Sequence, residues 1–409
     1  MLRILHTSDW HIGAHFHGVS RSADHAAFFE WLVAAVDEHA VDALIVAGDV
    51  FDRAQPSNES LALYYDLLIA LRDTGLRKIV VLGGNHDSPS QLDAPEQLLG
   101  RLDVHVVGGL QRERLSRHII PLQDRDGITA AAVVAMPYVH EWQLGVRGAG
   151  KAPGELRRDM ASAFRELHTE LCDIAHERHA GAAIVGTGHL TVEGDGLQDG
   201  DAPREIHFVG KIAGLPADIF DPRMRYVALG HIHRPMPAGG GRAWYCGTPI
   251  PFGHGEMAVG RRALLVEVAG SDAPLRPTPL PIPLHRALVQ LEGSLAQVAE
   301  AIAALSWDEP APPLVSARLH VDEHVPGAND QLQQVLDAKF SSGDRPALAH
   351  VRQIARVADN ADPTVHYDVT ALSPMRVFEL LCERAAPAVM DDELREAFAT
   401  AQAEAERTT

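Results

Sequence analysis

Five short apolar runs in the first 233 residues each lead directly into a cluster of Asp, Asn and His, in the stretches RILHTSDWH, ALIVAGDVFD, IVVLGGNHD, AAIVGTGH and RYVALGHIH. Apolar runs of this length are typical of buried strands. Loops that leave the same edge of a sheet converge, so side chains distant in the sequence can meet in one crevice. The repetition therefore predicts a layered sheet protein with one polar site at a sheet edge.

Amphipathic helices alternate with these runs, as in a layered α/β domain. Phe28, Leu32 and Val36, for example, recur at helical spacing and mark one apolar face. The expected helices are Asp24–His39, Ser60–Thr74 and Glu155–His179. The expected strands are Arg3–Thr7, Ala43–Ala47, Lys78–Leu82, Ala131–Ala135, Ala182–Gly186, Arg225–Leu229 and Ala263–Val268.

A proline-rich segment, PLRPTPLPIP at residues 274–283, predicts a stiff connector and a domain boundary, because its five prolines exclude a helix. After it the sequence predicts a small α+β unit, with strands Ala287–Leu291, Val315–Val321 and His350–Val357 and helices Leu295–Leu305 and Asp330–Phe340. Ser373 and Pro374 indicate the start of a further helix, and another is expected from about Asp391 through Ala405. We therefore expect three parts: an α/β domain at 1–280, an α+β domain at 281–362 and C-terminal helices at 363–409.

The polar clusters supply carboxylates, an amide oxygen and imidazoles, and no cysteine. This mixture suits manganese, iron or zinc better than calcium, which prefers oxygen ligands alone. Each motif alone is more often a turn or a packed histidine than a metal ligand, and only the series makes a metal site the better interpretation. Two ions about 3.5–4 Å apart that share one carboxylate would use the whole set. The candidate ligands are Asp9, His11, Asp49, Asn85, His189, His231 and His233.

The overall charge argues against unaided binding to nucleic acid. Lys and Arg number 36 and Asp and Glu number 55, which gives a net charge of −19. Any grip on DNA must therefore come from local basic patches, bound metal ions or a partner subunit. The three cysteines form no paired framework, which favours the cytoplasm, and we expect neither an export signal nor a membrane span.

The ordered series DWH, GDVFD, GNHD, GH and GHIH resembles the calcineurin-type metallophosphoesterase superfamily. The stretches SDWHIG, VDALIVAGDVFD, GGNHDS, RYVALGHIHRP and GTPIPFGHGE resemble, more narrowly, the SbcD family of nuclease subunits from bacterial SbcCD complexes. The resemblance covers most of residues 1–260. It implies a layered β-sandwich flanked by helices, followed by a smaller capping domain.

The resemblance also implies a role for each site residue. One metal ion would be held by Asp9, His11, Asp49 and His233, and a second by Asp49, Asn85, His189 and His231, with manganese the expected metal. His86 would protonate the leaving oxygen. The carboxylate of Asp52 would accept a hydrogen bond from the His86 ring and fix its tautomer; the alternative is that Asp52 only caps its loop.

The implied activity is endonucleolytic and 3′-to-5′ exonucleolytic cutting of DNA ends and hairpins in repair, recombination and replication. The implied partners are DNA, a second copy of the chain, and an SbcC-type coiled-coil ATPase that docks on the C-terminal helices through Val377, Phe378, Leu380, Leu381, Leu394 and Phe398. Alternatively, these apolar residues pack on one another or on the capping domain.

Other functions remain open from the motifs. A small-molecule phosphodiesterase acting on cyclic nucleotides would use the same ligands but would not need the C-terminal third. A protein phosphatase is a poorer match, because GNHD carries Asp87 where that family has glutamate. A non-catalytic scaffold is disfavoured by the complete ligand set.

Overall fold

The computed structural model describes residues 1–147, 150–193, 214–270, 273–340, 345–355, 375–379, 394–395 and 397–398. The chain divides into two compact units, Met1–Ile354 and Ala355–Thr409. Nearly all the described residues belong to the first unit. In the part of the chain that is described, no helix is both long enough and apolar enough to cross a membrane.

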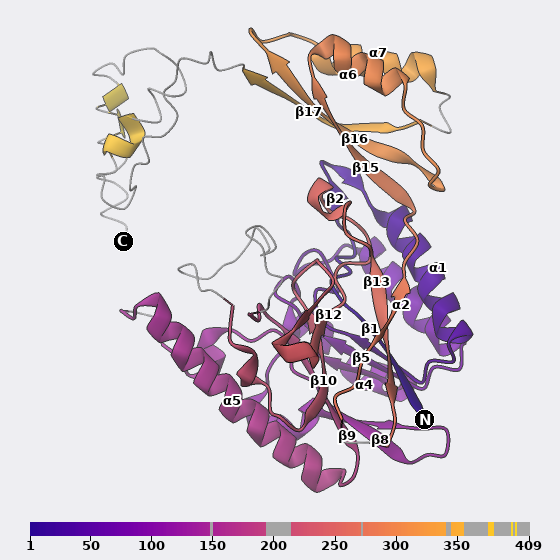
Figure 1. Cartoon of the computed structure of the whole chain (residues 1–409), viewed down its shortest axis with the longest axis vertical. Helices are drawn as coiled ribbons and strands as arrows, with labels where there is room; N and C mark the ends of the chain where they lie inside the picture. The colour runs from indigo at the N-terminus through magenta and orange to yellow at the C-terminus, as the bar shows by residue number, and fades with distance from the viewer. Residues whose placement is uncertain are drawn as a thin grey trace. The chain divides into compact units, whose positions relative to one another are not determined.

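Six strands form the first sheet, and its central strands run parallel (Figure 1). Thr7 pairs with Val46, and Val46 pairs with Val81, so the carboxyl ends of β1, β4 and β5 lie level with one another. β13 pairs with β1 in the antiparallel direction. The order across the sheet is β14 (Thr278–Pro281), β13 (Arg262–Val268), β1 (Leu2–Thr7), β4 (Ala43–Val46), β5 (Lys78–Leu82) and β6 (Val104–Val107).

The second sheet also has six strands and the same kind of parallel centre. β8 pairs in parallel with β9, and β9 with β10, so that Gly230 lies beside His189 at their carboxyl ends. The order is β11 (Met236–Ala238), β12 (Ala243–Tyr245), β10 (Met224–Gly230), β9 (Ala183–His189), β8 (Thr129–Val134) and β7 (Ile119–Gln123).

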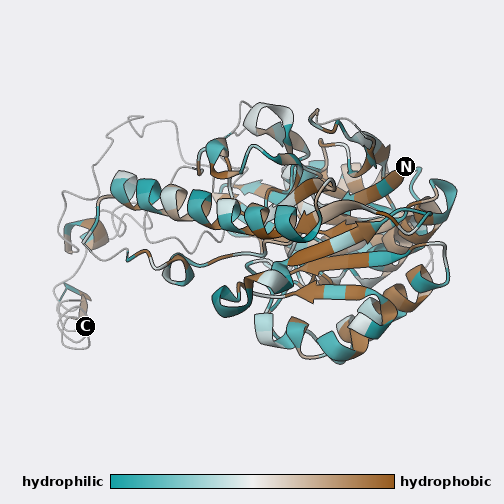
Figure 2. Ribbon diagram, turned by 90° about the horizontal axis from the view of Figure 1, so that it is seen from below, coloured by the Kyte–Doolittle hydropathy of each residue, from teal (hydrophilic) through white to brown (hydrophobic). Residues whose placement is uncertain are grey.

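The two sheets pack face to face through a continuous apolar layer that includes Ile4, Ile45 and Val80 from the first sheet and Val185 and Ala228 from the second. Helices α1 (Ser22–Glu38) and α2 (Asn58–Arg72) cover the first sheet, and α5 (Pro153–Arg178) covers the second. Figure 2 shows the strands as largely hydrophobic and the outward faces of the helices as hydrophilic. This arrangement confirms the predicted α/β sandwich flanked by helices.

A separate three-stranded sheet lies in the segment predicted as the α+β domain. Its order is β15 (Arg286–Gly293), β16 (Ala311–Val321) and β17 (Ala347–Ala355), and β15 and β16 are parallel. Helices α6 (Leu295–Ala303) and α7 (Ala328–Lys339) pack on it through Val298, Ile302, Leu332 and Leu336. We refer to residues 286–355 as the capping sheet.

Short elements complete the described chain: β2 (His15–Phe16), β3 (Val19–Ser20), α3 (Pro89–Asp93), α4 (Glu96–Leu99) and several single 3-10 turns. The predicted strands and helices of residues 1–355 all occur, with ends shifted by a few residues. The proline-rich segment is not only a connector, because Thr278–Pro281 forms β14; at the edge of the sheet a strand can carry prolines without losing pairing on both sides.

The predicted C-terminal helices fall mostly outside the described residues. Residues 375–379, 394–395 and 397–398 are helical. Within this unit the Phe378 ring stacks on Phe398, with centroids 4.1 Å apart. Leu380 and Leu381 lie outside the described residues.

Candidate metal centre

All seven predicted ligands come together where the parallel strands of both sheets end. Asp9 and His11 follow β1, Asp49 follows β4, and Asn85 follows β5. His189 is the last residue of β9, and His231 and His233 follow β10. The Nδ1 atom of His189 lies 2.8 Å from the Ala47 carbonyl oxygen, which joins the two sheets directly at this edge.

Backbone strain is concentrated at these loops. Asp9, His11, Asp49 and His231 have φ values of 54°, 47°, 49° and 92°, a region that residues other than glycine rarely adopt. Such conformations cost free energy and persist only where the surroundings enforce them, typically at functional sites. Backbone hydrogen bonds from Asp9 to Gly48 and from His11 to Asp49, each 3.0 Å, hold two of the loops in register.

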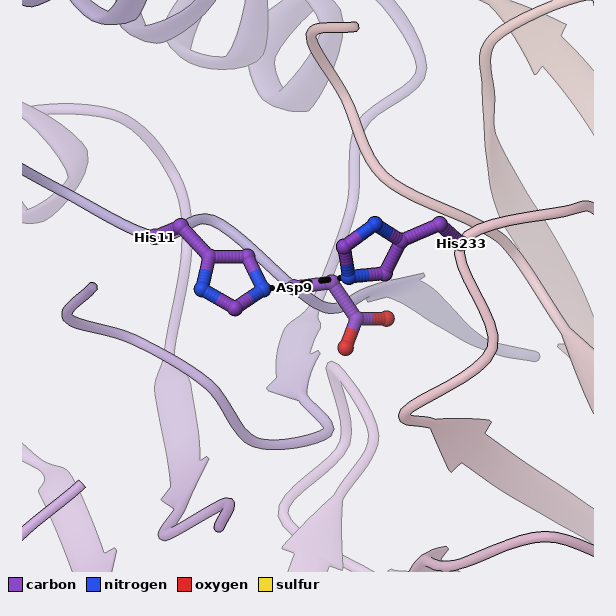
Figure 3. A group of neighbouring side chains, drawn as sticks. All are labelled: Asp9, His11 and His233. Atoms are coloured by element: carbon purple, nitrogen blue, oxygen red, sulfur yellow. Dashed lines mark hydrogen bonds between the residues drawn. The ribbon is translucent and has the colours of Figure 1, made fainter. Parts of the chain in front are cut away.

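Asp9, His11 and His233 form one compact group of potential metal donors (Figure 3). The Nε2 atoms of His11 and His233 face each other at 3.1 Å, with the Asp9 carboxylate beside them. Two imidazoles that aim ring nitrogens at one point, next to a carboxylate, are arranged as ligands of a cation.

Asp49 makes the next set of contacts and, like Asp9 and His11, occurs in two of the three potential donor groups among the described residues. Its Oδ2 atom lies 3.2 Å from His189 Nε2 and 3.6 Å from His11 Nε2. One carboxylate therefore faces histidines from both sheets. The role of Asp49 as a ligand shared by two ions stays a prediction.

Asn85 occupies the far side of the cluster. Its Oδ1 atom lies 3.1 Å from His189 Nε2 and 2.9 Å from His231 Nδ1. The backbone N–H of His231 donates to Asp9 Oδ1 at 2.8 Å and so connects the Asn85 side to the Asp9 side. An amide oxygen and two imidazoles make a second mixed donor set.

Charge in this buried cluster is balanced between neighbours. Burial would raise the pKa of Asp49 and lower that of His189, but their mutual attraction lowers the pKa of Asp49 and raises that of His189 to about 9. Burial, reinforced by the nearby His189, lowers the pKa of His231 to about 3, and burial also holds that of His11 well below its usual value. His231 and His11 therefore offer neutral ring nitrogens beside the ionised Asp49, whereas a bound divalent transition metal would displace the extra proton from His189.

Glu256 orients one of the candidate ligands. Its Oε1 atom lies 2.8 Å from His233 Nδ1, and its Oε2 atom accepts a 2.6 Å hydrogen bond from the Phe252 N–H. A carboxylate behind a ligating histidine fixes the tautomer and directs the other ring nitrogen at the metal. The carbonyl of Ala47 is placed in the same way behind His189.

His86 lies beside the cluster and contacts the main chain of Asp52. Its backbone N–H donates to Asp49 Oδ1 at 2.9 Å, and its ring lies edge-on to His11 with centroids 4.8 Å apart. The Nδ1 atom is 3.0 Å from the backbone carbonyl oxygen of Asp52, and the bond to the Asp52 carboxylate stays a prediction. One Asp52 carboxylate oxygen lies 3.9 Å from His11 Nδ1.

Asp87 has a structural role that the motif did not reveal. Its buried carboxylate accepts hydrogen bonds from the backbone N–H groups of Val50, Phe51 and Gly84, at 3.0, 2.9 and 2.8 Å. It thereby ties the loop after β4 to the loop after β5. Both Asp87 and Glu256 lie in stretches that resemble the SbcD family, but their partners are distant in the sequence, and no spacing pointed to them.

Glycine is required where two of these loops touch ligands. A Cβ atom on Gly84 would lie 2.1 Å from Asp49 Oδ1, and one on Gly48 would lie 2.2 Å from His189 Nδ1. Both distances are far below van der Waals contact. The glycines of GDVFD and GGNHD therefore let the backbone approach the candidate ligands.

The histidines left outside the predicted set have other partners. His6 is buried, with Nδ1 2.8 Å from the Tyr226 hydroxyl. His17 stacks on His350 at 4.5 Å, and His254 Nε2 lies 2.7 Å from the Ser316 hydroxyl. His15 is exposed. Two of these contacts join the α/β domain to the capping sheet.

Comparison with known proteins agrees with the motifs. The calcineurin-like phosphoesterase family matches residues 2–235, a span that contains all seven candidate ligands and His86. The D subunit of nuclease SbcCD from Rhodobacter capsulatus is 37% identical over 82% of this chain and 85% of its own length. Proteins of the same name from Escherichia coli K12 and Bacillus subtilis are each 32% identical, over 82% and 65% of this chain and 82% and 66% of their own lengths.

A likeness to solved structures adds nothing to this result. A beta-glucosidase from Exiguobacterium marinum matches with a TM-score of 0.23 and 11% identity over 87% of this chain and 89% of its own, which is too weak to indicate a common fold. The family match and the relatives confirm the resemblance predicted from the motifs. The chain belongs to the calcineurin-like phosphoesterase family and, within it, to the SbcD nuclease subunits of SbcCD complexes.

Proposed function

We propose that this chain is a metal-dependent nuclease that cuts DNA as the SbcD-type component of an SbcCD-type complex. The observation that carries the proposal is the convergence of seven donor side chains around Asp49, in a chain whose relatives are named as nuclease subunits. A small-molecule phosphodiesterase would use the same donors, but neither the relatives nor the capping sheet favours it.

Two divalent ions, manganese by preference, would occupy the cluster. Asp9, His11, Asp49 and His233 would hold one ion, and Asp49, Asn85, His189 and His231 the other. Such ions activate water for attack and stabilise negative charge on the phosphate. The ligand geometry supports the division, because Asp49 lies between the His11 side and the His189 side.

We assign His86 as the proton donor to the leaving oxygen, and Asp52 as the residue that positions it. A carbonyl oxygen can only accept a hydrogen bond, so Nδ1 of His86 carries a proton when it contacts Asp52. Nε2 is then the ring nitrogen whose proton is exchanged. The main-chain carbonyl of Asp52 would thus fix the tautomer, together with the predicted contact of its carboxylate.

A pair of substitutions tests these roles. His86→Ala should lower kcat by roughly 10²–10⁴-fold, the usual contribution of a general acid. Asp52→Asn should lower kcat by a smaller factor, because the backbone carbonyl remains while the charge of the carboxylate is lost. An unchanged kcat in Asp52→Asn would show that the carboxylate has no part in positioning His86.

We further propose that DNA binding depends on partners. A net charge of −19 opposes binding to a duplex, so an SbcC-type ATPase and a second copy of the chain would supply the grip. Residues 363–409 would dock the ATPase. Deleting the chain from Ser373 onward should abolish the partner complex and leave metal binding intact, whereas co-purification of the shortened chain with the ATPase would refute this assignment.

We also propose a cytoplasmic location, because Cys172 and Cys246 are buried free thiols, as is common in a reducing compartment.

The central experiment on function compares two substrates. The purified chain, with and without the partner ATPase, is incubated with Mn²⁺ and either labelled hairpin DNA or bis(p-nitrophenyl) phosphate. The proposal predicts that the complex cuts the hairpin. Turnover of the small diester alone, with DNA untouched even in the complex, would overturn it.

A further inference from the structure

We propose that Tyr138, His140 and Trp142 form a stacking surface that receives an unpaired base of the DNA strand whose phosphate lies at the candidate metal centre. We call these three residues the aromatic step. The inference rests on the proposed nuclease function and names residues that would select single-stranded or frayed ends.

The aromatic step begins at the metal centre. It follows the carboxyl end of β8, which lies beside β9 and therefore beside His189. The Tyr138 N–H donates to the carbonyl of Gly83, in the loop that carries Asn85 and His86, at 2.8 Å. The half-buried Tyr138 ring lies edge-on to the His189 ring, with centroids 6.3 Å apart and planes at 80°.

From Tyr138 the rings continue to the surface. His140 lies edge-on to Tyr138 with centroids 4.9 Å apart. Trp142 stacks on His140 with centroids 6.1 Å apart and planes at 16°. Its side chain is 70% exposed, so a large ring surface is presented to solvent at the outer end of the series.

The exposed ring is presented from a well-anchored turn. Val139 and Leu144, which flank the turn Glu141–Leu144, are 4% and 6% exposed and belong to the core under α5. The His140 N–H donates to Gln143 Oε1 at 2.9 Å. A single exposed apolar side chain needs no explanation. A series of ring contacts from a fixed turn to a candidate ligand is a more specific arrangement.

Stacking is the binding mode that suits this chain. Glu141 lies between His140 and Trp142 in the sequence, and its negative charge would repel phosphates. The net charge of the chain is also negative. Base stacking on an aromatic ring depends little on charge and tolerates any sequence, because every base has a flat face. The occupant that fits is thus a base, with its backbone directed toward the metal ions.

The test measures kcat/KM of the chain in complex with its partner ATPase, supplied with Mn²⁺, on a labelled oligonucleotide with a single-stranded 3′ overhang and on bis(p-nitrophenyl) phosphate. Trp142→Ala should lose roughly 5- to 150-fold on the oligonucleotide, the usual effect of removing one stacked base. The small diester, which has no flanking nucleotide, should change less than about twofold. Trp142→Phe should restore most of the lost activity.

The matched control is Ile128→Ala. Ile128 is 64% exposed and precedes β8, at the opposite end of the strand from the aromatic step. Its truncation should leave kcat/KM unchanged on both substrates. A second arm moves an abasic nucleotide along the overhang: one position should slow the wild-type chain, and that penalty should vanish in Trp142→Ala.

Each outcome separates the inference from the proposed function. Equal oligonucleotide rates for wild type and Trp142→Ala would overturn the inference alone. An equal loss on both substrates would also overturn it, because it would indicate damage to the metal centre. A wild-type complex that turns over the diester but cuts no DNA would overturn the nuclease proposal, and this inference with it.

Discussion

Glu256 shows how one side chain can fix the direction of a candidate ligand. Burial lowers the pKa of His233, but the hydrogen bond to Glu256 and the neighbouring carboxylates more than offset it and raise that pKa to about 9. The carboxylate therefore favours a proton on Nδ1. With Nδ1 so occupied, Nε2 is the nitrogen turned toward His11 and available to a metal ion.

Replacing Glu256 should weaken metal binding without unfolding the chain. We expect Glu256→Ala to reduce Mn²⁺ affinity by roughly 10- to 100-fold, the usual cost of removing the carboxylate behind a ligating histidine. Titration of the metal-free protein with Mn²⁺ measures the change. Glu267→Gln on the exposed side of β13 is the control. Unchanged affinity in Glu256→Ala would show that His233 needs no such support.

At the scale of elements, two segments next to candidate ligands also contact the capping sheet. The hairpin β2–β3, which follows His11, buries Phe16 against Leu288 and Leu314. The turn His254–Glu256 contacts His233 at one end and bonds to Ser316 of β16 at the other. The capping sheet is thus physically joined to the Asp9 side of the cluster.

Phe16 should matter for stability because it fills this junction. It is 5% exposed, and its truncation to Ala should cost about 3 kcal/mol through lost burial and the cavity left behind. Urea unfolding of Phe16→Ala measures the loss. His15→Ala, on the exposed face of the same hairpin, should change the free energy of unfolding by less than about 0.5 kcal/mol. Equal effects of the two changes would contradict the described packing.

Helix α5 carries a buried histidine that makes folding sensitive to acid. His168 Nδ1 lies 2.7 Å from the carbonyl of Ile219, and burial lowers the pKa of His168 from 6.5 to about 4. Since the folded pKa is below the unfolded one, the stabilising contribution is present above pH 6.5 and is lost as pH falls toward 4.

The size of that contribution can be measured by substitution. Between pH 7.5 and pH 5 the free energy of unfolding should fall by about 2 kcal/mol because of His168, which stays neutral in the folded chain but gains a proton in the unfolded chain. Unfolding of metal-free wild type and His168→Gln at both pH values should show a shallower acid loss in the variant. An equal fall in the free energy of unfolding between the two pH values in both proteins would mean that His168 is not the group that titrates.

At the scale of the whole molecule, local pattern predicted the layers and the position of the site. The runs before Asp9, Asp49 and Asn85 are short, apolar and followed by glycine or polar residues, so both the strands and their common edge could be inferred. β6 was missed because His105 interrupts the short apolar run VHVV at Val104–Val107. β14 was missed because prolines tolerated at a sheet edge indicate a connector when they are seen in sequence alone.

What could not be predicted depends on contacts between distant segments. Glu256 reaches His233 across 23 positions, and Asp87 reaches the loop after β4 across 36 or 37 positions. No periodicity links such residues. The Asp52 carbonyl was missed for a different reason: sequence motifs report side chains, whereas here the contact belongs to the main chain.

The proposed chemistry depends on two divalent ions around Asp49, and an anomalous-scattering experiment tests it most directly. Crystals of the chain grown with Mn²⁺ should show two anomalous peaks, one between Asp9, His11, Asp49 and His233 and one between Asp49, Asn85, His189 and His231. Crystals of Asp49→Ala should lose at least one of them. A wild-type map with no peak in this cluster, or with manganese only elsewhere, would contradict the proposed metal centre.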